Sequence, residues 1–397
     1  MSTRLPPAWL VVLGGVAGAL HVGKLPPALP VLREMLGLGL VEAGFLLSLV
    51  QFAGMALGLV IGLAADHLGL KRTMVAGLLL CGVASVAGGF AASAAQLLVL
   101  RAAEGLGFLL ASMPAPGLIR RLVPPARLSG MLGVWGAYMP FATAAALLCG
   151  PAWMAAAGWS GWWWLLGGFS LVMAAWLALA VPADQRAGVH AGDWLPRIRQ
   201  TLSAPGPWLV AGAFGVYSAQ WLSVIGFLPS IYLAAGVAPA WAATATGLAA
   251  AVNMVGNLLS GRLLQRGVPA RTLMAVGYAT MGLGGLLAFS DLLGGGAAAA
   301  AVRYAAVLAF SAVGGMIPGT LFSLAVQLAP SERTVSTTVG WMHQWSAFGQ
   351  FAGPPLVAWV AARAGGWQWS WLVTGACAAT GLVLAGVSAR LVRVRGH

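Results

Sequence analysis

The chain alternates between long apolar runs and short polar links along its whole length. A helix that crosses a bilayer needs about 20 predominantly apolar residues, and twelve runs of suitable length can be counted. The pattern therefore predicts an all-α integral membrane protein with about twelve transmembrane helices. The expected spans are residues 8–30, 40–64, 73–92, 95–119, 128–153, 160–181, 207–233, 240–264, 272–290, 298–328, 335–362 and 367–390.

The longest polar stretch divides the chain near its middle. We expect an N-terminal six-helix bundle at residues 1–181, a cytoplasmic linker at 182–206 and a C-terminal six-helix bundle at 207–397. Basic residues concentrate in the even-numbered links and the C-terminal tail, whereas the opposite links contain only Arg33 and Arg363. Because Lys and Arg accumulate on the cytoplasmic side, we predict a multi-pass protein of the bacterial inner (plasma) membrane with both termini in the cytoplasm.

The two predicted bundles repeat each other in sequence. An offset of 199 residues places Trp9 on Trp208, Pro30 on Pro229 and Arg72 on Arg271. Further along the chain, an offset of 206 places Pro124 on Pro330 and Trp135 on Trp341. An offset of 202 places Arg101 on Arg303. Six spans separate equivalent helices, so the two pseudo-symmetric bundles run in the same direction. Such parallel repeats usually hold their solute near the middle of the membrane, between the halves.

Composition narrows the class of protein. Hydrophobic residues make up 60% of the chain and charged residues only 7%, against about 25% charged residues in a soluble domain. The net charge of +13 is spread over short loops, which disfavours a nucleic-acid partner. Because the sequence contains no recognisable catalytic, phosphate-binding or metal-binding arrangement, we expect no enzyme, no cofactor and no metal. The expected partners are a small-molecule solute and the lipid bilayer, and the expected state is a monomer.

One polar link carries a family resemblance. The link between the second and third runs is Gly62-Leu-Ala-Ala-Asp66-His-Leu-Gly69-Leu-Lys71-Arg72, which resembles the G-x-x-x-D-x-x-G-x-[KR]-[KR] loop of the major facilitator superfamily. The resemblance implies a twelve-helix secondary transporter in which these five named residues form a gating loop at the cytoplasmic side.

Two further segments carry the resemblance. Arg101-Ala-Ala-Glu104-Gly105 is similar to the R-x-x-x-G motif of the same family. Pro27-Ala-Leu-Pro30 is similar to the first helix of the cyanate and nitroimidazole transporter branch, although the arginine–proline pair of that branch is missing.

Ionisable side chains inside the predicted spans are few, and such residues often mark a solute or ion pathway because they are costly to bury. His21 and Lys24 are three residues apart and share a helix face, as do Arg101 and Glu104. Lys24 could instead extend to the outer surface, and His21 or the Arg101–Glu104 pair could be structural. Glu104, the only deep carboxylate, is the candidate for proton coupling. The candidate solute-binding residues are His21, Lys24, Arg101, Trp135, Tyr138, Gln220, Arg303, Trp341, His343 and Gln344.

A charge comparison gives the leading hypothesis for function. Three cations, Lys24, Arg101 and Arg303, face one deep acid, Glu104, and a buried excess of positive charge favours an anion. We expect a proton-coupled secondary transporter of a small organic or inorganic anion, working by alternating access, with Arg101 and Arg303 clamping the anion from the two halves. The alternatives are efflux of apolar drug-like compounds through aromatic contacts and, in another class, a transporter-like receptor or channel.

Overall fold

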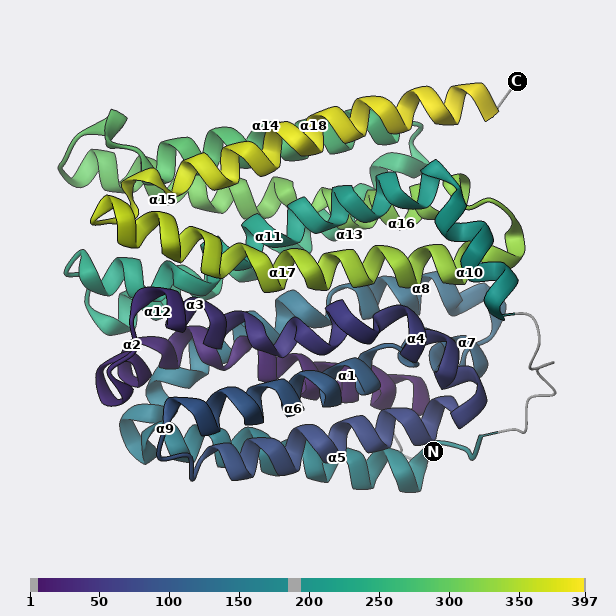
Figure 1. Cartoon of the computed structure of the whole chain (residues 1–397), viewed down its shortest axis with the longest axis horizontal. Helices are drawn as coiled ribbons and strands as arrows, with labels where there is room; N and C mark the ends of the chain where they lie inside the picture. The colour runs from purple at the N-terminus through teal and green to yellow at the C-terminus, as the bar shows by residue number, and fades with distance from the viewer. Residues whose placement is uncertain (1–5, 185–193, 396–397) are drawn as a thin grey trace. The chain divides into compact units, whose positions relative to one another are not determined.

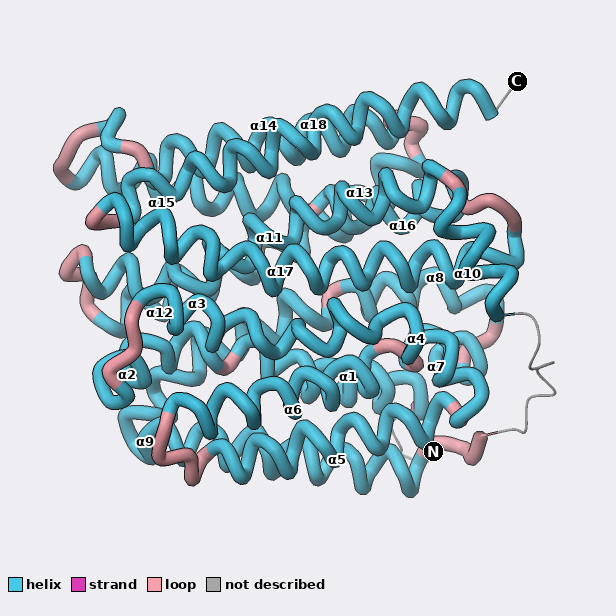
Figure 2. The backbone as a smooth tube through the Cα atoms, in the orientation of Figure 1, coloured by secondary structure: helices cyan, strands magenta, loops and turns pink. Residues whose placement is uncertain are grey.

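The structure is a computed structural model that describes the backbone of residues 6–184 and 194–395, with side chains except at 62–67, 125–126, 129–130, 133 and 392–395. Every regular element in these ranges is a helix (Figure 2). Residues 185–193 of the predicted linker lie outside the described ranges. The all-α fold predicted from the apolar runs is confirmed.

The chain divides into two compact units. Unit 1 comprises Met1–Leu38 and Leu49–Ala191, and unit 2 comprises Gly39–Ser48 and Gly192–His397. Unit 2 thus includes the short helix α3 (Leu40–Ser48), whereas the apolar runs predicted that this segment belongs to the N-terminal bundle. The reason is local packing, since a Cβ atom at Gly44 would lie 2.9 Å from the Cα atom of Pro355 in helix α17.

Unit 1 is built from helices that the sequence interrupts with proline and glycine. Pro26 and Pro27 lack an N–H group and cannot continue the hydrogen bonding of α1, so α1 ends just before Lys24 and α2 begins just after it. Gly158, with φ of 70°, breaks the long helix α9 into two. The elements of unit 1 are α1 (Pro7–Gly23), α2 (Leu25–Leu36), η1 (Leu49–Gln51), α4 (Phe52–Leu68), α5 (Leu70–Gly88), α6 (Ala94–Ser112), α7 (Ala115–Leu122), α8 (Pro125–Gly136) and α9 (Tyr138–Ala180).

Unit 2 follows the same plan, with the additional short helices α3 and α10. Its elements are α3 (Leu40–Ser48), α10 (Trp194–Ser203), α11 (Pro205–Ala234), α12 (Pro239–Ala251), α13 (Asn253–Gln265), α14 (Ala270–Phe289), η2 (Asp291–Leu293), α15 (Ala297–Gly314), α16 (Met316–Leu328), η3 (Glu332–Thr334), α17 (Val335–Ala364), η4 (Trp367–Trp369) and α18 (Ser370–Arg395) (Figure 1).

Ten helical stretches within the described residues are long and apolar enough to cross a membrane. One of them, α9, contains two of the predicted spans on either side of Gly158. Helix α17 has 30 residues, which is ample length, but its threonine, histidine and glutamine residues make it more polar than the other ten. Counting α9 twice and adding α17 gives the twelve spans predicted from the sequence.

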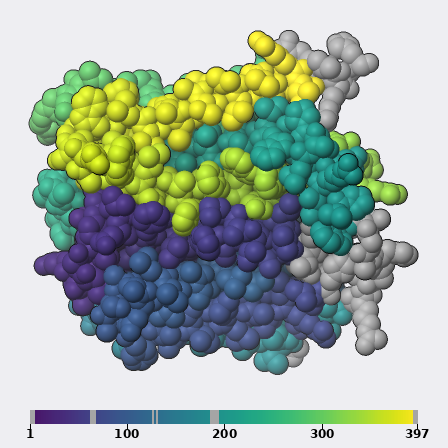
Figure 3. Space-filling view, viewed as in Figure 1, coloured from purple at the N-terminus to yellow at the C-terminus, as the bar shows by residue number. Residues whose placement is uncertain are grey.

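Glycines allow the helices of unit 1 to approach closely. A Cβ atom at Gly77 in α5 would lie 2.5 Å from the carbonyl oxygen of Gly107 in α6, and a Cβ atom at Gly23 in α1 would lie 2.8 Å from the Cα atom of Thr143 in α9. Helices α1, α5, α6 and α9 therefore pack side by side (Figure 1). On the face drawn in Figure 3, the side chains of the purple and blue helices of unit 1 are closely packed.

The repeat seen in the sequence is also visible in the packing, and it corrects one alignment. Gly77 faces the carbonyl of Gly107, and Gly277 in α14, which lies one residue beyond the position given by the offset of 199, faces the carbonyl of Val313 in α15. The offset between α6 and α15 is therefore 206, from 107 to 313, and not 202. At this offset Arg101 aligns with Val307, so the sequence alignment of Arg101 on Arg303 was wrong.

Candidate functional site: a buried charge cluster in unit 1

Four ionisable residues from two helices meet in the interior of unit 1. His21 lies near the end of α1, Lys24 lies at the α1–α2 junction, and Arg101 and Glu104 lie one turn apart in α6. All four are fully buried. We call these residues the charge cluster. The two pairs that the sequence predicted on separate helix faces are therefore part of one group.

Lys24 is the centre of the charge cluster. Its Nζ atom forms an ion pair with Oε1 of Glu104, donates a hydrogen bond of 2.8 Å to Oγ of Ser85 and lies 3.3 Å from Nδ1 of His21. It also lies 4.4 Å from the centre of a ring of Trp163, within the range of a cation–π contact. An ammonium group has three N–H donors, and these three acceptors match them. Lys24 therefore does not extend to the surface.

Glu104 is shared between two cations. Its Oε2 atom lies 2.5 Å from Nη1 of Arg101, while Oε1 pairs with Lys24. The same Nη1 atom donates a 2.6 Å hydrogen bond to the carbonyl oxygen of His21, which joins α6 to α1. Within the described part of the structure, the Nε and Nη2 atoms of Arg101 are buried and have no hydrogen-bond partner.

Two serines form further hydrogen bonds with the charge cluster. His21 Nε2 lies 2.8 Å from Oγ of Ser170 in α9, and Ser85 in α5 donates a 2.8 Å hydrogen bond to the carbonyl of Trp163. If Lys24 donates to His21 Nδ1, the proton of the neutral imidazole must be on Nε2, so that His21 donates to Ser170. Ser85 and Ser170 were not predicted from the sequence, because single serines in apolar helices are common and carry no spacing signal.

The charge cluster carries unbalanced charge. With His21 neutral, the charges of Lys24 and Arg101 add to +2 and that of Glu104 is −1, which leaves +1. A buried charge without a counter-charge is costly, and a bound anion or the loss of a proton would each remove this excess. The arrangement can therefore couple the binding of a negative group to a change in protonation.

The predicted aromatic candidates form separate groups in each unit. In unit 1, Trp135 stacks on Tyr138 with ring centres 4.1 Å apart, and its ring covers Gly15 of α1. In unit 2, Trp341 contacts Trp208 at 4.9 Å and Trp345 at 6.1 Å. Its indole Nε1 is buried and unpartnered among the described residues. We call Trp208, Trp341 and Trp345 the tryptophan group.

The remaining polar candidates of unit 2 have dissimilar surroundings. His343 lies between the rings of Phe214 and Phe322, at 5.7 and 5.4 Å. Gln220, which aligns with His21, is fully buried, and neither its nitrogen nor its oxygen has a hydrogen-bond partner in the described residues. Gln344 is partly buried in α17.

Arg303 lies in α15 and contacts the end of α14. It is partly exposed and donates a hydrogen bond of 3.4 Å to the carbonyl oxygen of Ser290, just after α14. By the corrected offset it aligns with Leu97, four residues before Arg101. Four residues of helix correspond to about 6 Å, so the two arginines do not occupy equivalent depths in the repeat. The expectation that Arg101 and Arg303 clamp an anion from equivalent positions of the two halves therefore loses its basis.

A second group of interactions joins three elements of unit 1 at the predicted gating loop. Gly69, with φ of 95°, precedes α5, and Asp184 accepts hydrogen bonds of 3.0 Å from the backbone N–H groups of Lys71 and Arg72. Arg121, at the end of α7, lies 3.1 Å from the same carboxylate. Gly62 and Asp66 belong to α4, but the structure describes only their backbone. Asp184 was not predicted as a member of this loop.

The environment of Asp184 lowers the pKa of its carboxyl group. Partial burial alone would raise this pKa, but the N–H groups of Lys71 and Arg72 and the guanidinium of Arg121 favour the charged form and outweigh it. Asp184 is therefore ionised at neutral pH and acts as an external cap for the first turn of α5.

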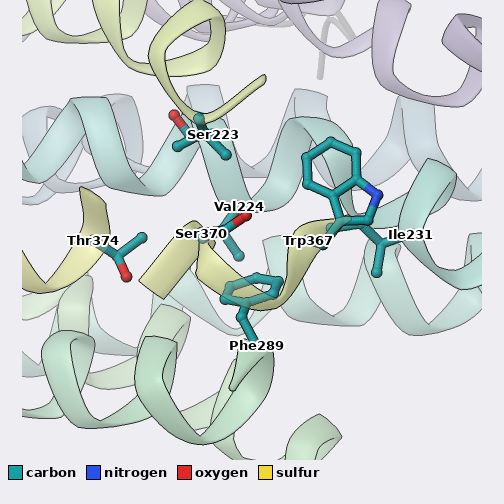
Figure 4. Close-up of a pocket in the computed structure, with 8 residues that line it drawn as sticks. Ser223, Val224, Ile231, Phe289, Trp367, Ser370 and Thr374 are labelled. Atoms are coloured by element: carbon teal, nitrogen blue, oxygen red, sulfur yellow. The ribbon is translucent and has the colours of Figure 1, made fainter. Parts of the chain in front are cut away.

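Unit 2 contains a small cavity at a position that is equivalent, in the repeat, to the charged Lys24 of unit 1. Ser223, Trp367, Ser370 and Thr374 contribute to its lining, and its volume of ≈ 10 Å³ accommodates a single water molecule (Figure 4). Ser223 aligns with Lys24 at the offset of 199. The cavity is too small for an organic solute, and the second bundle lacks the counterpart of the Lys24 ammonium.

Known proteins resemble this chain over most of its length. A family model described as the Major Facilitator Superfamily matches residues 11–354. An uncharacterized MFS-type transporter of Mycobacterium tuberculosis (strain ATCC 25618 / H37Rv) is 27% identical over 221 residues, which cover 54% of this chain but only 36% of that relative's length.

Two solved structures share the fold. Both are of a bacterial homolog to the human lysosomal transporter Spinster in an inward-facing conformation. The occupied form has a TM-score of 0.78 at 16% identity and covers 96% of each chain. The unoccupied form has a TM-score of 0.72 at 17% identity and covers 98% of each chain.

Proposed function

Because the chain belongs to the major facilitator superfamily and is a membrane transporter rather than an enzyme, we propose that it carries a small anion by alternating access and couples this movement to protons. The observation that carries the proposal is the fully buried guanidinium of Arg101. Two of its three nitrogen atoms have no hydrogen-bond partner among the described residues, and it belongs to a cluster with one excess positive charge.

An anion would satisfy both features at once. A guanidinium presents its N–H groups as a planar fork that matches a carboxylate or a similar planar anion. An anion on Nε and Nη2 of Arg101 would supply the missing acceptors and bring the net charge of the charge cluster to zero. The Nε and Nη2 atoms of Arg101 are buried in this conformation, so the anion reaches them in another state of the transport cycle.

Proton coupling belongs to the same group of residues. Glu104 is the shared counter-charge of Lys24 and Arg101, and an anion that attracts Arg101 competes directly with it. Solute binding therefore changes the electrostatic environment of every ionisable group in the charge cluster. We place proton exchange in this cluster and anion recognition on Arg101.

The test is a stability measurement with defined anions. Purified protein in detergent is heated with formate, cyanate, nitrate or phosphate, since a ligand that binds only the native state raises the melting temperature by mass action. We expect one of the small monovalent anions, formate, cyanate or nitrate, to stabilise the wild-type protein. The effect should be much smaller for Arg101→Lys, which keeps the charge but loses the fork. Equal stabilisation of both proteins would contradict anion recognition by Arg101.

A second function has its own structural support. The tryptophan group of unit 2 offers apolar ring surfaces and one indole N–H without a partner in the described part of the chain, which suits an aromatic drug-like compound. Efflux of such compounds would make cells that express the protein resistant to them, and Trp341→Ala would abolish this resistance. Resistance that is lost with Trp341→Ala but unchanged by Arg101→Lys would favour drug efflux over anion transport.

The remaining expectations are also proposals. A carrier shows counterflow of labelled against unlabelled solute, whereas a channel or a receptor does not, and we expect counterflow. The distribution of Lys and Arg in the links supports our proposal that both termini lie in the cytoplasm. We also propose that the protein is a monomer in a bacterial inner membrane. The likeness of Pro27-Ala-Leu-Pro30 to the cyanate and nitroimidazole branch makes cyanate a suitable first probe.

A further inference from the structure

We propose that Lys24 carries the coupled proton, so that one proton and one monovalent anion cross the membrane together with no net movement of charge. This inference rests on the proposed anion transport and names the group that makes the coupling. Two arguments support it: the geometry of the charge cluster, and the comparison of which residue of the cluster can change its charge at the lowest cost in free energy.

The possible protonation states differ in their buried net charge. Arg101 stays charged at all accessible pH values. Protonation of Glu104 would leave Lys24 and Arg101 as two buried cations without a counter-charge, which is the most unfavourable state. Deprotonation of Lys24 instead leaves the Arg101–Glu104 pair, with a net charge of zero. The variable charge of the cluster therefore belongs to Lys24.

The contacts of Lys24 are compatible with both a protonated and a neutral amine. As an ammonium it donates to Glu104, Ser85 and the Nδ1 atom of His21 and lies over the ring of Trp163. As a neutral amine it has one lone pair, and the hydroxyl group of Ser85 can rotate away from the Trp163 carbonyl to donate to it. Glu104 would remain bound to Arg101 in both states.

The charged and titratable groups around Lys24 can be named for each packed helix. Helix α6 contributes Arg101 and Glu104, α1 contributes His21, and α5 contributes the buried thiol of Cys81. Helix α9 supplies Ser170 and Trp163, and its sequence from Tyr138 to Ala180 contains no Asp, Glu, Lys, Arg or His. Glu104 is thus the acid that faces Lys24 among the described residues.

The charge balance gives the order of events. With the anion bound, Lys24 and Arg101 offset Glu104 and the anion. When the anion leaves, an N–H bond of the Lys24 ammonium breaks, the proton passes to water in the receiving compartment, and the neutral amine remains beside the Arg101–Glu104 pair. Loading reverses these steps. The cluster is neutral in both states that cross the membrane, which gives symport at a ratio of one to one.

The transport test uses proteoliposomes and 14C-cyanate, with empty liposomes as the background. In the wild-type protein, an inward proton gradient should drive accumulation at least tenfold above equilibrium exchange, and valinomycin-clamped potentials should have no effect. Lys24→Arg, whose charge is permanent, should retain cyanate exchange above the background but lose gradient-driven accumulation. Accumulation that persists in Lys24→Arg and disappears in Glu104→Gln would overturn the proposal and assign the proton to Glu104.

A second measurement does not depend on transport or on correct folding of a Lys24 variant. The sequence contains two lysines, Lys24 and Lys71, so 13Cε-lysine labelling gives two resonances, and Lys71→Arg assigns them. The Lys24 resonance should move with pH over the range in which uptake depends on pH. A Lys24 resonance that stays fixed between about pH 5 and pH 10 would overturn the proposal, while absence of cyanate exchange in the wild type would count against the proposed function alone.

Discussion

The carboxylate of Asp184 accepts a 3.0 Å hydrogen bond from the backbone N–H of Lys71, 113 residues earlier in the chain. The N–H of Arg72 donates to the same carboxylate. These two N–H groups lie in the first turn of α5, where a helix has donors without internal partners. Gly69, at the usual capping position, has no side chain for the purpose. Asp184 therefore fixes the start of α5 from the end of α9.

Replacing Asp184 with Ala should destabilise unit 1 by about 1–2 kcal/mol, because loss of a helix cap leaves N–H groups unpaired. Thermal unfolding in detergent measures the loss, and hydrogen exchange should accelerate at Lys71 and Arg72. Asp291→Ala is the matched control, since Asp291 is exposed in the link after α14. Equal effects of the two substitutions would show that Asp184 does not act as a cap.

The same contact should depend on pH with a defined sign. The pKa of Asp184 is lower in the folded protein than its ordinary value, so its contribution is complete above the unfolded pKa of about 4. The contribution is lost as the pH falls through the lower, folded pKa. Acid unfolding curves of the wild type and Asp184→Ala should therefore converge below about pH 4; a constant difference down to the lowest pH would contradict this assignment.

The charge cluster predicts unequal effects of two substitutions. At a pH low enough to keep Lys24 protonated, Glu104→Gln leaves Lys24 and Arg101 buried without a counter-charge and should cost about 3–5 kcal/mol. Lys24→Met leaves the balanced Arg101–Glu104 pair and should cost about 1–3 kcal/mol. The double variant has one unpaired cation where Glu104→Gln has two, so it should be more stable than Glu104→Gln alone. Simple addition of the two losses would show that Lys24 and Glu104 are not coupled.

The contact of Trp135 with Gly15 can be tested by a minimal change. A Cβ atom at Gly15 would overlap the Trp135 ring, so Gly15→Ala should cost about 1–3 kcal/mol and displace Trp135 from Tyr138. Gly168→Ala, also in unit 1, is the control because no atom within 4 Å would meet the added methyl group. Melting temperatures and tryptophan fluorescence report the two effects; a harmless Gly15→Ala would mean that the ring moves freely.

The fold was predictable because the membrane imposes length and apolarity on every span. Two details escaped this reasoning. Apolar character alone does not show that α9 continues to Gly158 and then bends, and it does not assign Gly39–Ser48 to unit 2. Both depend on backbone geometry and on which helix a segment packs against, which the spacing of apolar residues does not encode.

The charge cluster was predictable only in part. Spacing by three residues placed His21 with Lys24 and Arg101 with Glu104, because residues three apart share a helix face. Their meeting depends on the contact between α1 and α6, and the roles of Ser85 and Ser170 depend on helices far away in sequence. Asp184 was missed for the same reason, since nothing in its own segment indicates that it caps α5.

The corrected alignment of the repeat no longer pairs Arg101 with Arg303. The two arginines should therefore contribute unequally to the affinity for the solute, and this difference can be measured. Arg303 donates a hydrogen bond to the Ser290 carbonyl, a bond that a lysine ammonium can replace. Arg101 instead combines contacts to Glu104 and His21 with two nitrogen atoms that have no partner among the described residues. Arg303→Lys should therefore leave the affinity for cyanate within about twofold, and Arg101→Lys should weaken it at least tenfold, a difference of about 1.4 kcal/mol or more. Titration of each purified variant, followed by tryptophan fluorescence, gives both affinities under the same conditions. A tenfold loss in Arg303→Lys would restore the two-arginine clamp and would require a transport state in which Arg303 leaves Ser290.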